Sequence, residues 1–258
     1  MSESPHSHPT TEAQPTEPTL FESTVEDGVL RLRRPETRWL SGGWNGGESE
    51  GPAAYSVSVP KGWSCDDVEG YVDDRLASAG FDEPGPALIT GVDHDHVRGA
   101  RCGPVEAYAT AGINNPAALP MDPEGEPDPT GEGLPDGELV AGTVNVIVGT
   151  SRSLAPGALA NLLSVAAEAK AATLLARTGF PGTTSDAVIA ASDPEGEPAE
   201  YTGSSTRVGA AARAAVRDAV YAALQSRYEN DDEAAVPVSV EDAAYGVSTD
   251  VRAEVFEP

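Results

Sequence analysis

Lys170 is the residue whose type and position most directly suggest chemistry. The chain has only two lysines, and Lys170 falls within a predicted helix at 159–177. At 100° per residue, Lys170 shares one apolar stripe with Leu159, Leu163, Ala166, Thr173 and Leu174. Such a lysine either extends its stem over the core so that its ammonium reaches water, or presents a partly desolvated ammonium. A desolvated ammonium binds an anion or stabilises negative charge that develops on a substrate oxygen.

Glu168 stands two residues before Lys170 and projects from the opposite side of this predicted helix. The two side chains therefore do not form a pair on one helix face. If both serve one site, that site must wrap around the helix.

Four loops concentrate Gly, Thr, Ser and Asn, which place hydroxyl and amide groups at the ends of predicted elements. Their sequences are TAGINNP (110–116), GTVN (142–145), GTTSD (182–186) and GSSTRVG (203–209). Turn formation alone accounts for each loop taken singly, because Gly supplies positive φ while Asn, Asp and Thr cap turns and helices. Only their convergence in space would make them one site.

Other motifs argue against several chemistries. His94 and His96, in the sequence DHDH, are two residues apart, but no third zinc ligand is identifiable, so we expect a solvated acidic loop there. The chain has no G-x-S-x-G elbow, no Walker-type loop and no dinucleotide fingerprint after a strand. Hydride transfer and ATP-driven chemistry are therefore disfavoured, and we expect neither a metal nor a cofactor.

Apolar periodicity predicts the α+β (mixed α/β) class, with a mixed sheet flanked by helices. Alternating or β-branched runs predict strands at 29–33, 55–59, 87–91, 105–110, 143–148 and 187–191. Helical spacing predicts helices at 65–79, 155–177 and 207–228.

Two segments are too rich in Pro, Glu and small polar residues to bury much apolar surface. They predict a disordered acidic tail at 1–20 and an acidic surface insertion at 120–138. One domain then spans 21–228. Residues 229–258 form an extension, in which 236–240 and 251–256 could pair as a hairpin.

The chain has 258 residues and a net charge of −26. Such a surface repels nucleic acid and anionic membranes, and no apolar run approaches the roughly 20 residues that span a bilayer. Few lysines and many carboxylates are typical of a protein that works in concentrated salt, where screening relaxes self-repulsion. With no secretory signal and only Cys65 and Cys102, we expect a cytoplasmic halophile protein with reduced thiols.

Six motifs, taken in chain order, resemble those of the adenosylcobinamide amidohydrolases of corrinoid salvage, in a form typical of haloarchaea. They are WLSGGWNGG (39–47), TAGINNP (110–116), GTVNVIV (142–148), EAKAA (168–172), GTTSD (182–186) and TRVG (206–209). Two of them depart from the family pattern. Thr184 replaces the second glycine of a Gly-Thr-Gly-Thr-Asp loop, and Arg207 stands where the family has lysine.

The resemblance implies hydrolysis of the amide that joins the corrin's propionyl side chain to aminopropanol. The products would be adenosylcobyric acid, which re-enters cobalamin assembly, and the free amino alcohol or its phosphate. The cobalt then belongs to the substrate. Two alternatives use the same loops: a corrinoid carrier that does not cleave its ligand, and an acyltransferase whose nucleophile is Thr183 or Thr184.

Amide hydrolysis needs an activated water or side-chain nucleophile, donors to the oxyanion, and an acid for the departing amine. Asp186 is the candidate base, acting on water or on the hydroxyl of Thr183, Thr184 or Ser185, and Glu168 is a second candidate. Lys170 could stabilise charge or protonate the amine. The candidate substrate-binding residues are Asn114, Asn115, Thr143, Asn145, Gly182, Thr184, Thr206 and Arg207. The last two lie at a helix start, which would favour a phosphate on the aminopropanol.

Overall fold

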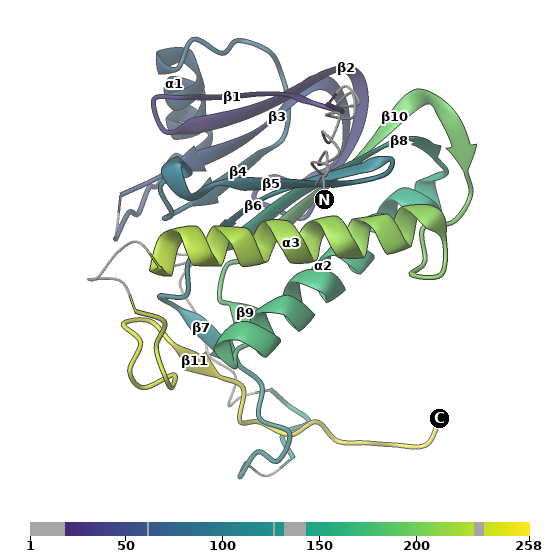
Figure 1. Cartoon of the computed structure of the whole chain (residues 1–258). Helices are drawn as coiled ribbons and strands as arrows, with labels where there is room; N and C mark the ends of the chain where they lie inside the picture. Colours follow the sequence, from purple (N-terminus) through teal and green to yellow (C-terminus); the bar gives the residue numbers. More distant parts are fainter. Residues whose placement is uncertain (1–18, 61, 126, 132–142, 230–234) are drawn as a thin grey trace, which may run out of the picture.

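A mixed β-sheet with helices on its faces forms the body of the protein (Figure 1). The computed structural model describes residues 19–60, 62–125, 127–131, 143–229 and 235–258. Within these residues the helices are α1 (Val68–Ser78), α2 (Pro156–Thr178) and α3 (Arg207–Tyr228). The strands of the large sheet are β1 (Glu22–Glu26), β2 (Val29–Ser41), β3 (Gly47–Ser58), β4 (Ala87–Thr90), β5 (Arg98–Cys102), β6 (Val105–Ala111), β8 (Val144–Leu154) and β10 (Ala187–Ala199). The predicted α+β class and single sheet-and-helix domain are confirmed.

The strand order is β4-β3-β2-β10-β8-β6-β5, with β1 paired to β2. β10 runs parallel to β8, and β3 runs parallel to β4, whereas the remaining pairs are antiparallel. A smaller sheet is formed by β7 (Pro116–Ala118), β9 (Gly182–Thr183) and β11 (Val247–Ser248), in the order β11-β7-β9.

Alternation along the central strands creates a core on each face of the sheet. In β8, Val146 and Val148 pack with apolar residues of α2 and α3, whereas Ile147 points to the other face. β10 repeats the pattern, with Val188 toward the helices and Ile189 away from them. A third core lies between α1 and the outer side of β2 and β3.

The large sheet folds over, so that its end strand β4 meets β8. β4 and β8 are separated by three strands in the sheet order, yet Asn145 Nδ2 of β8 donates to the carbonyl of Ile89 in β4 at 2.8 Å. Leu88 of β4 packs in the same core as Ile147. The result is a layered body, with β1 to β3 on the side of α1 and with α2 and α3 on the opposite side (Figure 1).

Local sequence sets the ends of the two long helices. Pro156 occupies the first turn of α2, where its missing N–H costs no hydrogen bond, and Gly179 closes the helix at φ +82°. Thr206 caps α3 by accepting from the backbone N–H of Gly209 at 3.1 Å.

Contrary to the expectation from the sequence, α2 is long and apolar enough to cross a membrane. Half of its apolar window is buried in the structure.

Several strands extend beyond the predicted runs, because their ends carry polar side chains. β2 continues past Arg33 and through Pro35, and its register with β3 shifts between Arg33 and Thr37. Glu36 has φ +54° at this irregularity, and Pro35 lies within it, since a proline in a strand is usually found at an irregular position. β1 and β5 were not predicted from the sequence, since their residues are mostly exposed and lack an apolar alternation.

The C-terminal extension does not form the predicted hairpin. Residues 236–240 and 251–256 do not pair with each other; β11 instead pairs with β7, and Arg252 bridges to Pro127. Arg252 also donates to the carbonyl of Pro123, so the extension packs on the start of the 120–138 segment. Residues 1–18 of the predicted tail and residues 126 and 132–138 of the predicted insertion lie outside the described residues.

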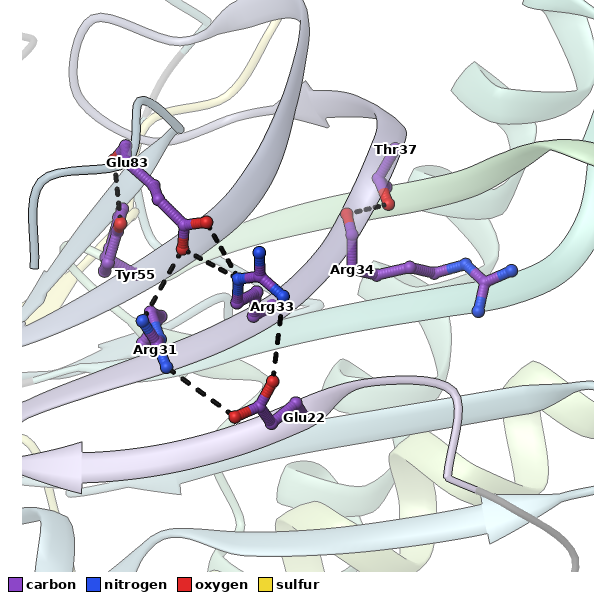
Figure 2. A network of polar contacts seen from close by, with 7 residues as sticks. All are labelled: Glu22, Arg31, Arg33, Arg34, Thr37, Tyr55 and Glu83. Atoms are coloured by element: carbon purple, nitrogen blue, oxygen red, sulfur yellow. Dashed lines mark hydrogen bonds and ion pairs between the residues drawn. The ribbon is translucent and has the colours of Figure 1, made fainter.

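An ion-pair network fixes the segment between α1 and β4 against β2 (Figure 2). The Glu83 carboxylate accepts from Arg33 Nε at 2.8 and 3.1 Å and lies 3.5 Å from Arg31 Nη1. Glu22 of β1 lies 3.9 Å from Arg31 and 3.8 Å from Arg33. The Tyr55 hydroxyl donates to the carbonyl of Glu83 at 2.7 Å, and burial raises the pKa of Tyr55 to about 12.

The DHDH segment is not the solvated loop that its sequence suggested. It forms a single 3₁₀ turn (His94–His96), and His94 is only 3% exposed. Its Nδ1 lies 3.1 Å from the carbonyl of Gly28, and its Nε2 lies 3.0 Å from Ser56 Oγ. Both ring nitrogens therefore have protein partners. The described residues contain no group of three or more potential metal-binding side chains.

We predict that His94 makes the fold acid-sensitive. Burial lowers the pKa of His94 below 6.5, although the hydrogen bond to the Gly28 carbonyl opposes this shift. The unfolded chain therefore binds a proton that the folded chain does not. The contribution to stability is present above about pH 6.5 and is lost as the pH falls, by at most about 1.4 kcal/mol per pH unit. Denaturant unfolding from pH 8 to pH 5 measures the free energy of unfolding of wild type and His94→Gln. We expect this free energy to fall more steeply with decreasing pH in wild type, and equal slopes in the two proteins would contradict the prediction.

Candidate active site

Asp186 is held by four hydrogen-bond donors at the end of the sheet where β8 and β10 begin. Lys170 Nζ donates to Oδ2, and the Thr183 hydroxyl donates to Oδ1. The backbone N–H of Val144 donates to Oδ1 at 2.8 Å, and that of Thr183 donates to Oδ2 at 3.1 Å. The Lys170 and Asp186 side chains are each only 9% exposed. The two residues form a buried ion pair in which each carboxylate oxygen has two donors, which is its ordinary capacity.

Secondary structure from three parts of the chain converges on this pair. Lys170 lies on the buried face of α2, as predicted, while Asp186 ends the turn between β9 and β10 and Val144 begins β8. A Cβ on Gly182 would lie 2.7 Å from Asp186 Oδ2 and 3.6 Å from Lys170 Nζ. The glycine therefore lets the backbone lie directly against the ion pair.

Asn115 organises the outer part of the GTTSD loop. It is fully buried, and its Nδ2 donates to Thr184 Oγ1 at 2.6 Å and lies 3.3 Å from Ser185 Oγ. Its carbonyl accepts from the backbone N–H of Thr184 at 3.1 Å. Thr184 itself is exposed. Asn115 thus fixes the loop, while Thr184 and Ser185 form its outer side.

Asn145 and Thr143 hold the strands together next to the ion pair. Asn145 donates to the Ile89 carbonyl and accepts from the backbone N–H of Ala187 at 3.1 Å, so both ends of its amide are engaged by backbone. The Thr143 hydroxyl lies 3.2 Å from Thr90 Oγ1. These contacts favour a structural role for Asn145 rather than the donation to an oxyanion suggested by the sequence.

Thr90 was missed by the sequence reasoning. It is fully buried, and its hydroxyl meets those of Thr110 and Thr143 and accepts from the backbone N–H of Val92. The available signal was its position at the end of a predicted strand.

Asn114 is half-buried, and its side chain makes no hydrogen bond to any residue that the structure describes. Its amide is available to a ligand.

Three predicted site residues lie away from this cluster. The Glu168 side chain is 64% exposed on the outer side of α2, where it faces Arg213. Thr206 uses its hydroxyl to cap α3, and Arg207 is exposed. The start of α3 and strand β9 lie at different ends of the molecule (Figure 1).

The Lys170–Asp186 pair should show strong energetic coupling. Lys170→Met or Asp186→Asn alone leaves one buried group without its charged partner and should cost about 3–5 kcal/mol of unfolding free energy. The double variant removes both charges and should recover much of that loss. Denaturant unfolding of all four proteins in molar KCl completes the cycle. If the loss of unfolding free energy in the double variant equalled the sum of the losses in the two single variants, the two groups would not interact.

The sequence comparisons agree with this constellation of motifs. A sequence model of the CbiZ family, described as adenosylcobinamide amidohydrolase, matches residues 12–232. An adenosylcobinamide amidohydrolase of Halobacterium salinarum is 56% identical over 241 residues, which cover 93% of this chain and all of the relative. A protein of the same name from Methanosarcina mazei is 26% identical over 200 residues, covering 74% of this chain and 91% of the relative.

Among solved structures, a β-aminopeptidase of a Burkholderia species has a TM-score of 0.41 at 17% identity, covering 78% of this chain and 80% of its own. The PH0078 protein of Pyrococcus horikoshii has a TM-score of 0.40 at 15% identity, covering 80% and 79%. The family assignment rests on the sequence matches instead. With the match covering most of its length, the chain belongs to the adenosylcobinamide amidohydrolase family.

Proposed function

We propose that this protein hydrolyses the amide between the corrin side chain and the aminopropanol of adenosylcobinamide, releasing adenosylcobyric acid and the amino alcohol. The observation that carries the proposal is the buried Lys170–Asp186 pair with the Thr183 hydroxyl bound to it. The names of the two relatives support the substrate. The corrin's cobalt is then part of the substrate, and the enzyme needs no cofactor of its own.

The cluster holds the chemical groups that amide hydrolysis requires. As the carbonyl carbon becomes tetrahedral, negative charge develops on its oxygen, and the Lys170 ammonium lies in the cluster to stabilise it. Asp186 accepts and returns the proton that the reaction moves. We assign the binding of a polar group of the substrate to Asn114, whose amide has no partner among the described residues.

The setting of the reaction is the salt-rich cytoplasm of a halophile. With a net charge of −26, the surface carboxylates repel one another, and concentrated salt screens this repulsion in the folded protein. The Halobacterium relative supports this setting. Activity and stability are therefore best measured in molar KCl.

The decisive experiment incubates the purified protein with adenosylcobinamide in molar KCl and follows adenosylcobyric acid by chromatography. Wild type should form the product. Lys170→Met and Asp186→Asn should each lose most of the turnover, by about a hundredfold or more, because each removes a charged group from the reacting centre. Circular dichroism confirms that the variants are folded. Tight binding of adenosylcobinamide without product would instead indicate a corrinoid carrier.

Gly182→Ala should reduce turnover without unfolding the protein. The added Cβ would meet Asp186 Oδ2 at 2.7 Å, so the carboxylate or the loop backbone must shift, which disturbs the ion pair with Lys170. Gly157→Ala is the matched control, because a Cβ at that position of α2 would meet nothing within 4 Å. The expected loss is about tenfold to a hundredfold in kcat for Gly182→Ala, since small displacements of catalytic groups are costly. Equal activities of the two variants would argue that the position of Asp186 does not matter.

A further inference from the structure

We infer that Thr183 is the nucleophile of the reaction and that hydrolysis proceeds through an ester between Thr183 Oγ and the corrin side-chain acyl group. This inference rests on the proposed function and adds the reacting atom to it. The alternative is direct attack by a water molecule that Asp186 deprotonates.

The carboxylate of Asp186 has no room for an additional water. Its two oxygens already accept four hydrogen bonds, from Lys170 Nζ, the Thr183 hydroxyl, and the backbone N–H groups of Thr183 and Val144. A carboxylate offers about four lone-pair positions. A water could reach Asp186 as its base only by displacing one of these donors. The Thr183 hydroxyl, by contrast, already directs its proton at Asp186.

The Thr183 oxygen is free on its other side. Because its hydrogen points to Asp186 Oδ1, its lone pairs face away from the carboxylate. No donor among the described residues hydrogen-bonds to them. The hydroxyl, the base and an orienting cation are thus arranged as in other activated nucleophiles. Asp186 accepts the hydrogen of the Thr183 hydroxyl, and Lys170 donates to Asp186 and orients it.

The neighbouring hydroxyls lack this arrangement. Thr184 Oγ1 and Ser185 Oγ face the Asn115 amide, and Thr143 and Thr110 face Thr90. Thr184, Thr143 and Thr110 show no hydrogen bond to a carboxylate among the described residues. Thr183, by contrast, is bound to Asp186.

Backbone pairing keeps the Thr183 hydroxyl in position. Thr183 lies in β9, where it pairs with Pro116 of β7, and its own N–H is bound to Asp186. The residue is 8% exposed, so a narrow group such as an extended amide arm can reach it more readily than the corrin ring itself. A fixed hydroxyl loses little freedom when it reacts.

The chemical steps balance without a further reagent. Thr183 Oγ forms a bond to the amide carbon while its proton passes to Asp186, and the carbonyl electron pair moves to oxygen beside the Lys170 cation. Collapse breaks the C–N bond, and the amine leaves with the proton from Asp186. In the ester, Thr183 Oγ no longer donates to Asp186, so a water takes that position on the carboxylate. This water attacks the ester and gives one proton to Asp186, which passes a proton to Thr183 Oγ as the ester bond breaks. The sum is amide plus water giving carboxylic acid plus amine.

The test compares Thr183→Val, which keeps the shape and removes the hydroxyl, with Thr183→Ser, which keeps the hydroxyl. Thr173→Val is the matched control, because Thr173 is a buried threonine of α2 whose hydroxyl donates only to the Ala169 carbonyl. Thr183→Val should lose about a thousandfold or more in turnover, whereas Thr183→Ser and Thr173→Val should stay within about tenfold of wild type.

Hydroxylamine separates the two routes more directly. With adenosylcobinamide and hydroxylamine, wild type and Thr183→Ser should yield the cobyric hydroxamate, and acid-quenched protein should carry the mass of the corrinoid acyl group on the 183-containing peptide. Hydrolysis by wild type with no hydroxamate and no adduct, or a Thr183→Val variant within about tenfold of wild type, would overturn the inference while leaving the proposed function intact. Absence of any hydrolysis by wild type would instead refute the proposed function.

Discussion

The buried ion pair between Lys170 and Asp186 is the contact on which the site depends. Removing two opposite charges from water is costly, and their mutual attraction offsets that cost only when the remaining hydrogen-bonding capacity is satisfied. Here the Val144 and Thr183 N–H groups and the Thr183 hydroxyl complete the carboxylate's partners. Because these donors come from β8 and from the β9–β10 turn, the ion pair fixes the relative positions of those elements and α2.

The folded sheet makes this contact possible. Alternating side chains in β8 and β10 give the sheet two apolar faces, and each must be covered. The helices cover one face, and the fold of the sheet brings β4 over the other. Asn145 and the Thr90 hydroxyl lie where β4 meets β6 and β8. Polar contacts therefore join β4 to β6 and β8 next to the site.

The loop at 182–186 divides its residues between two tasks. Thr183 and Asp186 point inward to the lysine, whereas Thr184 and Ser185 lie on the outer side with the Asn115 amide. This division is consistent with the departure from the family pattern at Thr184. The position is exposed, and its backbone does not adopt positive φ, so a side chain is accommodated where the family has glycine.

The sequence by itself determined the strongly periodic parts of the protein. The helices at 155–177 and 207–228, the central strands and the position of Lys170 on the apolar face of its helix follow from local spacing, because a side chain's face in a helix or strand depends only on nearby residues. The ordered motifs likewise sufficed for the family. Polar strands such as β1, and the pairing of β11 with β7, carry no such periodicity and were missed or mispredicted.

Only the tertiary structure decided which loops meet. The lysine and Asp186 are 16 residues apart in the chain, but Asn115 and Thr184 are 69 apart and Thr90 and Thr143 are 53 apart. Local patterns give no information on such contacts, which arise when the sheet folds over and α2 packs on it. The same packing placed Glu168, Thr206 and Arg207 away from the cluster and buried His94, because burial depends on neighbours that are remote in sequence.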